Sequence, residues 1–133
     1  MISFLSANKD LGLLIMRIGL GIMMVLHGWP KIIGGPDRWE SLGRNTEFLG
    51  ITFLPVFWGF MGALAEFLGG ALLAAGFFAR TAAFFLICTM IVAAATHLGK
   101  GDGLMGASHA IEVGFAFIGL LFLGPGKYSF NQK

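Results

Sequence analysis

The stretch LGLLIMRIGLGIMMVLHGWP, residues 11–30, decides the fold class of this chain. It is apolar or small almost throughout, with the charge of Arg17 near its beginning and His27 near its end. About 20 helical residues cross ~30 Å of hydrocarbon, so this run predicts a membrane-spanning helix. His27 and Lys31 lie one helical turn apart where that helix would meet water, and they are the first polar residues that need an explanation.

The composition of the whole chain agrees with a membrane protein. Of its 133 residues, 56% are hydrophobic and 12% are charged, whereas an average soluble domain is about 25% charged. The 21 glycines suit helices that pack closely against one another in lipid. A net charge of +2 without a basic run argues against nucleic-acid binding. The single cysteine, Cys88, excludes an intramolecular disulfide and therefore a self-contained dithiol mechanism.

Four segments are long and apolar enough to span a bilayer, and no strand-like alternation competes with them. They are residues 11–31, 54–79, 81–98 and 104–123. We therefore predict an all-α fold, an integral membrane four-helix bundle with up-down antiparallel topology, as a single domain over residues 1–133. The N-terminal residues lack a basic region and a cleavage site, so we expect the first span to be retained and not removed as a signal peptide.

The one long connection, residues 32–53, lies between the first two spans. Trp39, Leu42 and Phe48 interrupt its charges at near-helical spacing. This pattern allows either a short helix lying at the membrane interface or an ordered polar loop.

The distribution of lysine and arginine sets the expected orientation, because cytoplasmic loops carry an excess of both. The side that holds the two termini has Lys9, Arg17, Arg80, Lys127 and Lys133. The opposite side has Lys31, Arg38, Arg44 and Lys100. The small excess predicts that both termini are cytoplasmic.

Ionisable side chains inside membrane spans cost about 2.5–3.5 kcal/mol each on insertion scales, so each one needs a reason. Arg17 lies close to the expected cytoplasmic end of the first span, and we expect its side chain to reach back to the headgroups as an anchor. Glu66 has Gly62 and Gly70 four residues away on either side, which predicts that it points into the bundle. Directions of the spans and side chains place six residues together beneath the outer face: His27, Lys31, Glu66, His97, His109 and Glu112.

Several chemistries fit a polar cluster of this kind. His and Glu side chains can bond the carbonyl oxygens of a quinone and relay its protons, and Met23, Met24, Phe57, Trp58 and Phe60 could then line an apolar slot. Histidine and carboxylate can also bind a metal ion, and histidine pairs can ligate haem. A solute path with a titratable gate and a purely structural network, in which Glu66 bonds a histidine or Lys31, are the other readings. The possible metal ligands are His27, His97, His109, Glu66 and Glu112.

The chain resembles the DoxX family, small four-helix membrane proteins of bacteria. The resemblance rests on RIGLGIMMVLHGWPKIIGG in the first span, AEFLGGALLAAGFFARTAA across the second and third, the region of His97, and EVGFAFIGLLFLGPGKYSF at the end. LHGWPK and GPGKYS match the family's HG-x-x-K and GPG-x-x-S patterns, while the family's usual aspartate near the end is replaced by FNQK. The family's recurrent positions fall on His27, Gly28, Lys31, Glu66, Gly69, Gly70, Arg80, Glu112, Gly124, Pro125, Gly126 and Ser129.

The resemblance implies a multi-pass protein of the bacterial inner membrane. Some relatives are the membrane subunit of a thiosulfate:quinone oxidoreductase, and others are linked to quinone or thiol stress or to complexes with soluble redox enzymes. We therefore expect a quinone-linked redox or redox-stress component, with quinone as the first candidate cofactor and a metal ion or haem after it. The alternatives are a small-solute or metal transporter and a non-catalytic assembly partner of a redox complex. The expected partners are the bilayer, a redox protein and a second copy of the chain. The sequence does not decide whether the chain is an enzyme.

Overall fold

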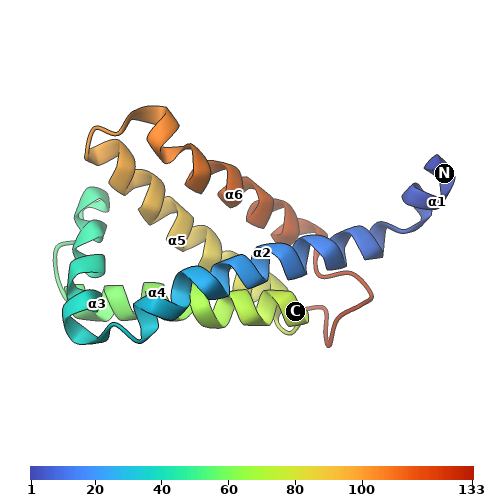
Figure 1. Cartoon of the computed structure of the whole chain (residues 1–133), viewed down its shortest axis with the longest axis horizontal. Helices are drawn as coiled ribbons and strands as arrows, with labels where there is room; N and C mark the ends of the chain where they lie inside the picture. The colour runs from blue at the N-terminus through green and yellow to red at the C-terminus, as the bar shows by residue number, and fades with distance from the viewer.

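The computed structural model describes all of residues 1–133 and is helical throughout its regular elements. A short helix α1 (Ile2–Ala7) precedes the first long helix, α2 (Lys9–Ile32), and buries none of its residues. The connection that follows holds α3 (Gly35–Gly43) and the 3₁₀ helix η1 (Arg44–Leu49). The other long helices are α4 (Pro55–Ala75), α5 (Ala79–Gly99) and α6 (Gly103–Leu123), and Figure 1 shows their arrangement.

The four long helices confirm the predicted all-α class and the four predicted spans, since each is long and apolar enough to cross a membrane. The main difference lies at the end of the second span, which was expected to reach residue 79. Helix α4 ends at Ala75 because Gly76 takes a left-handed conformation with φ of 77°, a backbone state that glycine adopts readily and that closes helices. A turn of three residues, 76–78, then leads into α5.

The long connection between the first two spans forms a helix, which answers the choice between helix and ordered loop. Pro36 lies in the first turn of α3, where a missing backbone N–H costs nothing. Helix α3 packs on the first half of α4, where Gly43 contacts the backbone of Pro55 and Gly59 contacts the backbone of Trp39. The absence of side chains at both glycines is what allows the two backbones to meet.

Helix α2 packs along the second half of α4, and the two run in opposite directions. Gly21 of α2 lies against Gly70 and Ala74 of α4, whereas Gly28 lies against Glu66 and Phe67. Because α2 covers only this part of α4, the first half of α4 is left for α3. Figure 1 shows α2 and α4 side by side, with α3 at the end of the molecule away from both termini.

Helices α5 and α6 form the other closely packed pair, and α4 joins the two pairs by packing on α5. Figure 1 shows α5 and α6 diverging from α2 and α4 toward the end that holds α3 and η1. There η1 contacts the end of α5, with Phe48 against Gly99. Helices α2 and α6 make no comparably extensive contact.

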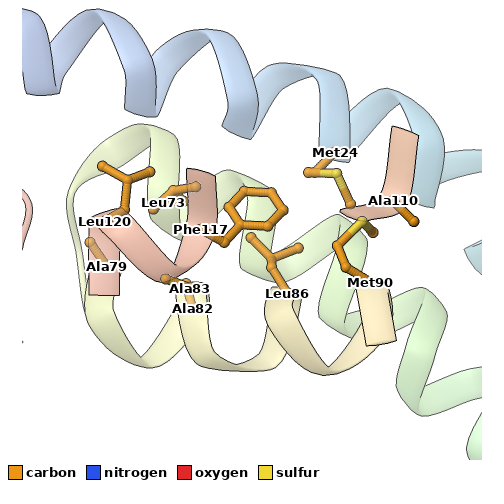
Figure 2. Packing of buried hydrophobic residues seen from close by; sticks show 10 residues of the cluster. All are labelled: Met24, Leu73, Ala79, Ala82, Ala83, Leu86, Met90, Ala110, Phe117 and Leu120. Carbon is orange, nitrogen blue, oxygen red and sulfur yellow. The ribbon is translucent and has the colours of Figure 1, made fainter. Parts of the chain in front are cut away.

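The buried core lies where the four long helices meet. Figure 2 shows Phe117 of α6 pointing between Leu73 of α4 and Leu86 of α5, with Met24 of α2 nearby. Many large apolar side chains remain exposed on the outer surfaces, among them Ile15, Phe84 and Phe122. Such a surface would be unfavourable in water and suits contact with lipid chains.

Candidate functional site

Lys31 and Glu66 form an ion pair between α2 and α4. The ammonium nitrogen Nζ of Lys31 lies 2.7 Å from Oε2 and 3.0 Å from Oε1 of Glu66, so it donates to both carboxylate oxygens. The Glu66 side chain is 10% exposed and that of Lys31 is 26% exposed. The prediction that Glu66 points inward is therefore confirmed, and its partner within the chain is Lys31.

Local packing explains how this pair forms. A Cβ at Gly28 would come within 2.5 Å of the Phe67 backbone nitrogen, so only glycine lets α2 approach α4 this closely. Lys31 follows one turn later, in the last turn of α2, where a cation also favours the negative end of the helix dipole. The indole Nε1 of Trp39 donates to the carbonyl oxygen of Lys31 at 2.9 Å, so α3 holds the end of α2 in place.

His27 and His109 form a second group, between α2 and α6. Their ring centroids are 6.4 Å apart and the ring planes are inclined by 54°. Both side chains are exposed. His27 lies one turn before Lys31 on α2, so the histidine pair adjoins the ion pair.

His97 does not join these groups but pairs with Asp102 across the turn between α5 and α6. Its Nδ1 lies 2.8 Å from Oδ2 of Asp102, and both side chains are about half exposed. Sequence reasoning missed Asp102, although a carboxylate five residues after a histidine across the glycine-containing turn GKGDG could have indicated the pairing.

Glu112 stands alone in the structure. It makes no hydrogen bond or ion pair, is exposed, and lies on the face of α6 opposite the buried Ala110 and Phe117. The single expected cluster is thus divided into the Lys31–Glu66 pair with the adjoining histidines His27 and His109, the His97–Asp102 pair, and Glu112. No three His, Cys, Asp or Glu side chains come together as a metal ion would require.

The structure contradicts the prediction that Arg17 reaches the lipid headgroups. Its side chain is not a headgroup anchor but is 1% exposed inside the protein. The guanidinium donates to carbonyl oxygens of Leu73 and Ala74 at the end of α4, at 3.1 and 3.3 Å, and to those of Pro125 and Tyr128 in the C-terminal tail, at 2.5 and 2.8 Å. The last carbonyl groups of a helix lack partners within the helix. Around Arg17, such carbonyl groups form the polar environment that we had expected lipid headgroups to supply.

The C-terminal tail is fixed at several further points around the same end of the molecule. The backbone nitrogens of Phe130 and Asn131 donate to the carbonyl of Gly76, and the backbone nitrogen of Phe78 donates to Oδ1 of Asn131. The backbone nitrogen of Lys127 donates to Oδ1 of Asp10 at 3.0 Å. The GPG segment therefore turns the chain back onto α2 and the α4–α5 turn.

The proposed apolar slot is not assembled from the residues expected to line it. Met24 belongs to the core, Phe60 meets Trp39 in an edge-to-face contact, and Trp58 packs against Phe53 and Phe57. An open apolar groove of about 160 Å³ lies instead between α5 and α6, lined by residues that include Met90, Ile111 and Phe115. It does not include the Lys31–Glu66 pair.

Two comparisons with known proteins found a match. The sequence model of the DoxX family matches residues 12–99. The inner membrane protein YqjF of Escherichia coli (strain K12) is 29% identical over 127 residues, which are 93% of this chain and 92% of the relative. No solved structure matches the chain. The family match and the four apolar helices together identify the chain as a member of the DoxX family and a multi-pass protein of the inner membrane.

Proposed function

We propose that this protein binds a quinone at the Lys31–Glu66 pair and acts as the membrane component of a quinone-linked redox or redox-stress system. The observation that carries this proposal is a salt bridge near the middle of α4 whose lysine remains partly open, next to two exposed histidines. A polar group this deep in an apolar helix is costly and is often functional.

The residues at this position have the hydrogen-bonding capacity that a quinone requires. The two oxygens of a quinone are acceptors, and Lys31 has three N–H donors of which Glu66 engages part. His27 and His109 can each donate from one ring nitrogen and accept at the other. Glu66 can accept a proton, as can either histidine, and such groups are the usual carriers of protons between a buried ligand and water.

The position of the pair also suits a ligand that arrives through the bilayer. His27 and His109 are exposed and Lys31 is partly exposed, so a flat, apolar ring could reach these polar groups from the lipid. The chain has one free cysteine, Cys88, and no group of three His, Cys, Asp or Glu side chains that could hold a metal ion. In this proposal the electrons come from a separate redox protein.

Binding of decylubiquinone, a short-tailed benzoquinone, to the purified protein in lipid nanodiscs tests this proposal. We expect saturable binding by isothermal titration calorimetry, and at least about tenfold weaker binding for Glu66→Gln, which removes the charge but keeps the shape. Glu40→Gln is the matched control, because Glu40 forms an exposed ion pair with Arg44 on α3. Uptake equal to that of empty nanodiscs, or unchanged affinity in Glu66→Gln, would refute a quinone site here.

A further inference from the structure

Arg80 has a charged side chain without an acceptor in the chain. It is the second residue of α5 and is exposed, and it forms no hydrogen bond or ion pair with the rest of the protein. The guanidinium groups of Arg17 and Arg44, in contrast, donate to oxygen atoms of the chain. A guanidinium has five N–H donors, so those of Arg80 are free to bind a ligand.

The Arg80 side chain is nevertheless held in a defined place. A Cβ at Gly124 would lie 2.6 Å from Nη2 and 2.9 Å from Nε of Arg80, so the guanidinium rests where position 124 has no side chain. Gly124 directly follows the last residue of α6. The guanidinium therefore extends from the beginning of α5 to the end of α6. Side chains lean toward the N-terminus of their helix, which directs Arg80 toward the headgroup region on the side of both termini.

The apolar groove between α5 and α6 lies on the same face of α5 as Arg80. Ile87 and Ile91 line the groove and follow Arg80 by seven and eleven residues, intervals that return to one face of a helix. At 1.5 Å per residue, the groove begins ~10 Å from Arg80. The acyl chains of one leaflet span about 15 Å, half of the ~30 Å hydrocarbon core. A chain whose headgroup lies at Arg80 therefore reaches the groove.

The charges at this end of the molecule favour an anionic headgroup. Lys9, Lys127 and Lys133 are exposed here together with Arg80, and the one acidic side chain, Asp10, accepts from the backbone nitrogen of Lys127. Arginine binds phosphate through two parallel N–H donors, and cations near a bilayer attract anionic lipids. A phospholipid occupies both the guanidinium and the apolar groove, whereas a soluble anion or an acidic protein would leave the groove unfilled.

We propose that Arg80 binds the phosphate of an anionic phospholipid, and that one acyl chain of this lipid lies in the groove between α5 and α6. The Lys31–Glu66 pair joins α2 to α4, and neither this pair nor the two adjoining histidines line the groove. The proposal therefore does not depend on quinone binding.

Native mass spectrometry with phosphatidylglycerol and phosphatidylethanolamine of identical acyl chains tests the headgroup contact. We expect the wild type to prefer phosphatidylglycerol, and Arg80→Gln to bind it at least about tenfold more weakly. A single exposed cation contributes only about fivefold by general attraction to an anionic surface, so Lys127→Gln should lose no more than this. Arg38→Gln is the matched control, because Arg38 is also exposed without an ion pair but lies on α3. Equal binding of both lipids by the wild type, or equal losses in Arg80→Gln and Lys127→Gln, would overturn the proposal.

A second measurement separates the acyl chain from the headgroup. Glycerophosphoglycerol has the same headgroup without chains, and we expect it not to displace phosphatidylglycerol from the wild type. Ala94→Phe narrows the groove and should weaken phosphatidylglycerol binding about tenfold while the preference over phosphatidylethanolamine remains. Ala71→Phe on the exposed surface of α4 is the control for the added ring. Displacement by glycerophosphoglycerol would show a site for free phosphate esters, and unchanged binding in Ala94→Phe would show that no chain fills the groove. Either result would refute a phospholipid as the occupant.

Discussion

Gly21 and Gly70 lie in reciprocal contact where α2 crosses α4. A Cβ at Gly21 would come within 2.5 Å of the carbonyl oxygen of Gly70, and a Cβ at Gly70 would come within 2.6 Å of that of Gly21. This crossing fixes the position of α2 along the length of α4. Toward the start of α2 it brings Arg17 to the last carbonyls of α4, and toward the end it brings Lys31 to Glu66.

The crossing predicts a large difference between two glycines of the same helix. Gly70→Ala should lower the free energy of unfolding by about 1–3 kcal/mol, because the added methyl group meets the backbone of α2 and the side chain of Met24. Gly62→Ala is the matched control, since a Cβ there meets nothing within 4 Å, and its effect should stay within about 1 kcal/mol. Unfolding in mixed micelles, followed by helical circular dichroism, measures both. Equal effects would show that the helices do not meet at Gly70.

The Lys31–Glu66 pair predicts that replacing Lys31 alone lowers stability more than replacing both residues. Lys31→Met leaves a buried carboxylate unpaired and should destabilise the protein by about 1–3 kcal/mol, less than for a fully buried pair because Lys31 is partly exposed. The double variant Lys31→Met with Glu66→Leu removes both charges and should recover most of this loss. The same unfolding measurement compares the two variants. A double variant less stable than Lys31→Met would mean that the pair itself holds α2 on α4.

The contacts of Arg17 predict that docking of the C-terminal tail depends on this one side chain. Arg17→Lys keeps the charge but cannot reach four carbonyl oxygens in two directions, so it should destabilise the protein by about 2–4 kcal/mol. Amide hydrogen exchange should rise most at residues 76 to 78 and 127 to 133, whose backbone groups the docked tail protects. Arg38→Lys on α3 is the control, because Arg38 is exposed. A tail that stays protected in Arg17→Lys would contradict this role.

The sequence predicted most of the secondary structure correctly for a clear reason. Within lipid, backbone N–H and C=O groups must bond within the segment, so a single long apolar segment crosses the membrane as a helix. The spans and the inward direction of Glu66 followed from this and from the glycines beside it. The helix over residues 35–43 was one of two alternatives, since its charges and aromatic residues suit either form until it packs on α4.

The partners of the polar residues could not be predicted in the same way. Arg17 and Lys31 look alike in the sequence, each a lone cation near the end of an apolar run. Only the tertiary structure surrounds Arg17 with carbonyls from the end of α4 and a tail more than 100 residues away. Likewise, His97, His109 and Glu112 share an expected depth, but the rotation of each helix about its axis turns them to different neighbours.

The sequence by itself thus determined that this is a membrane protein of four apolar helices, because length and hydrophobicity alone set the cost of each segment in lipid. The tertiary structure decided which polar groups meet. Lipid is as apolar as the helix surfaces, so hydrophobicity does not set how helices rotate and cross, and close packing at small residues does. The contacts at Gly21, Gly28 and Gly70 therefore fix the pairing of Lys31 with Glu66.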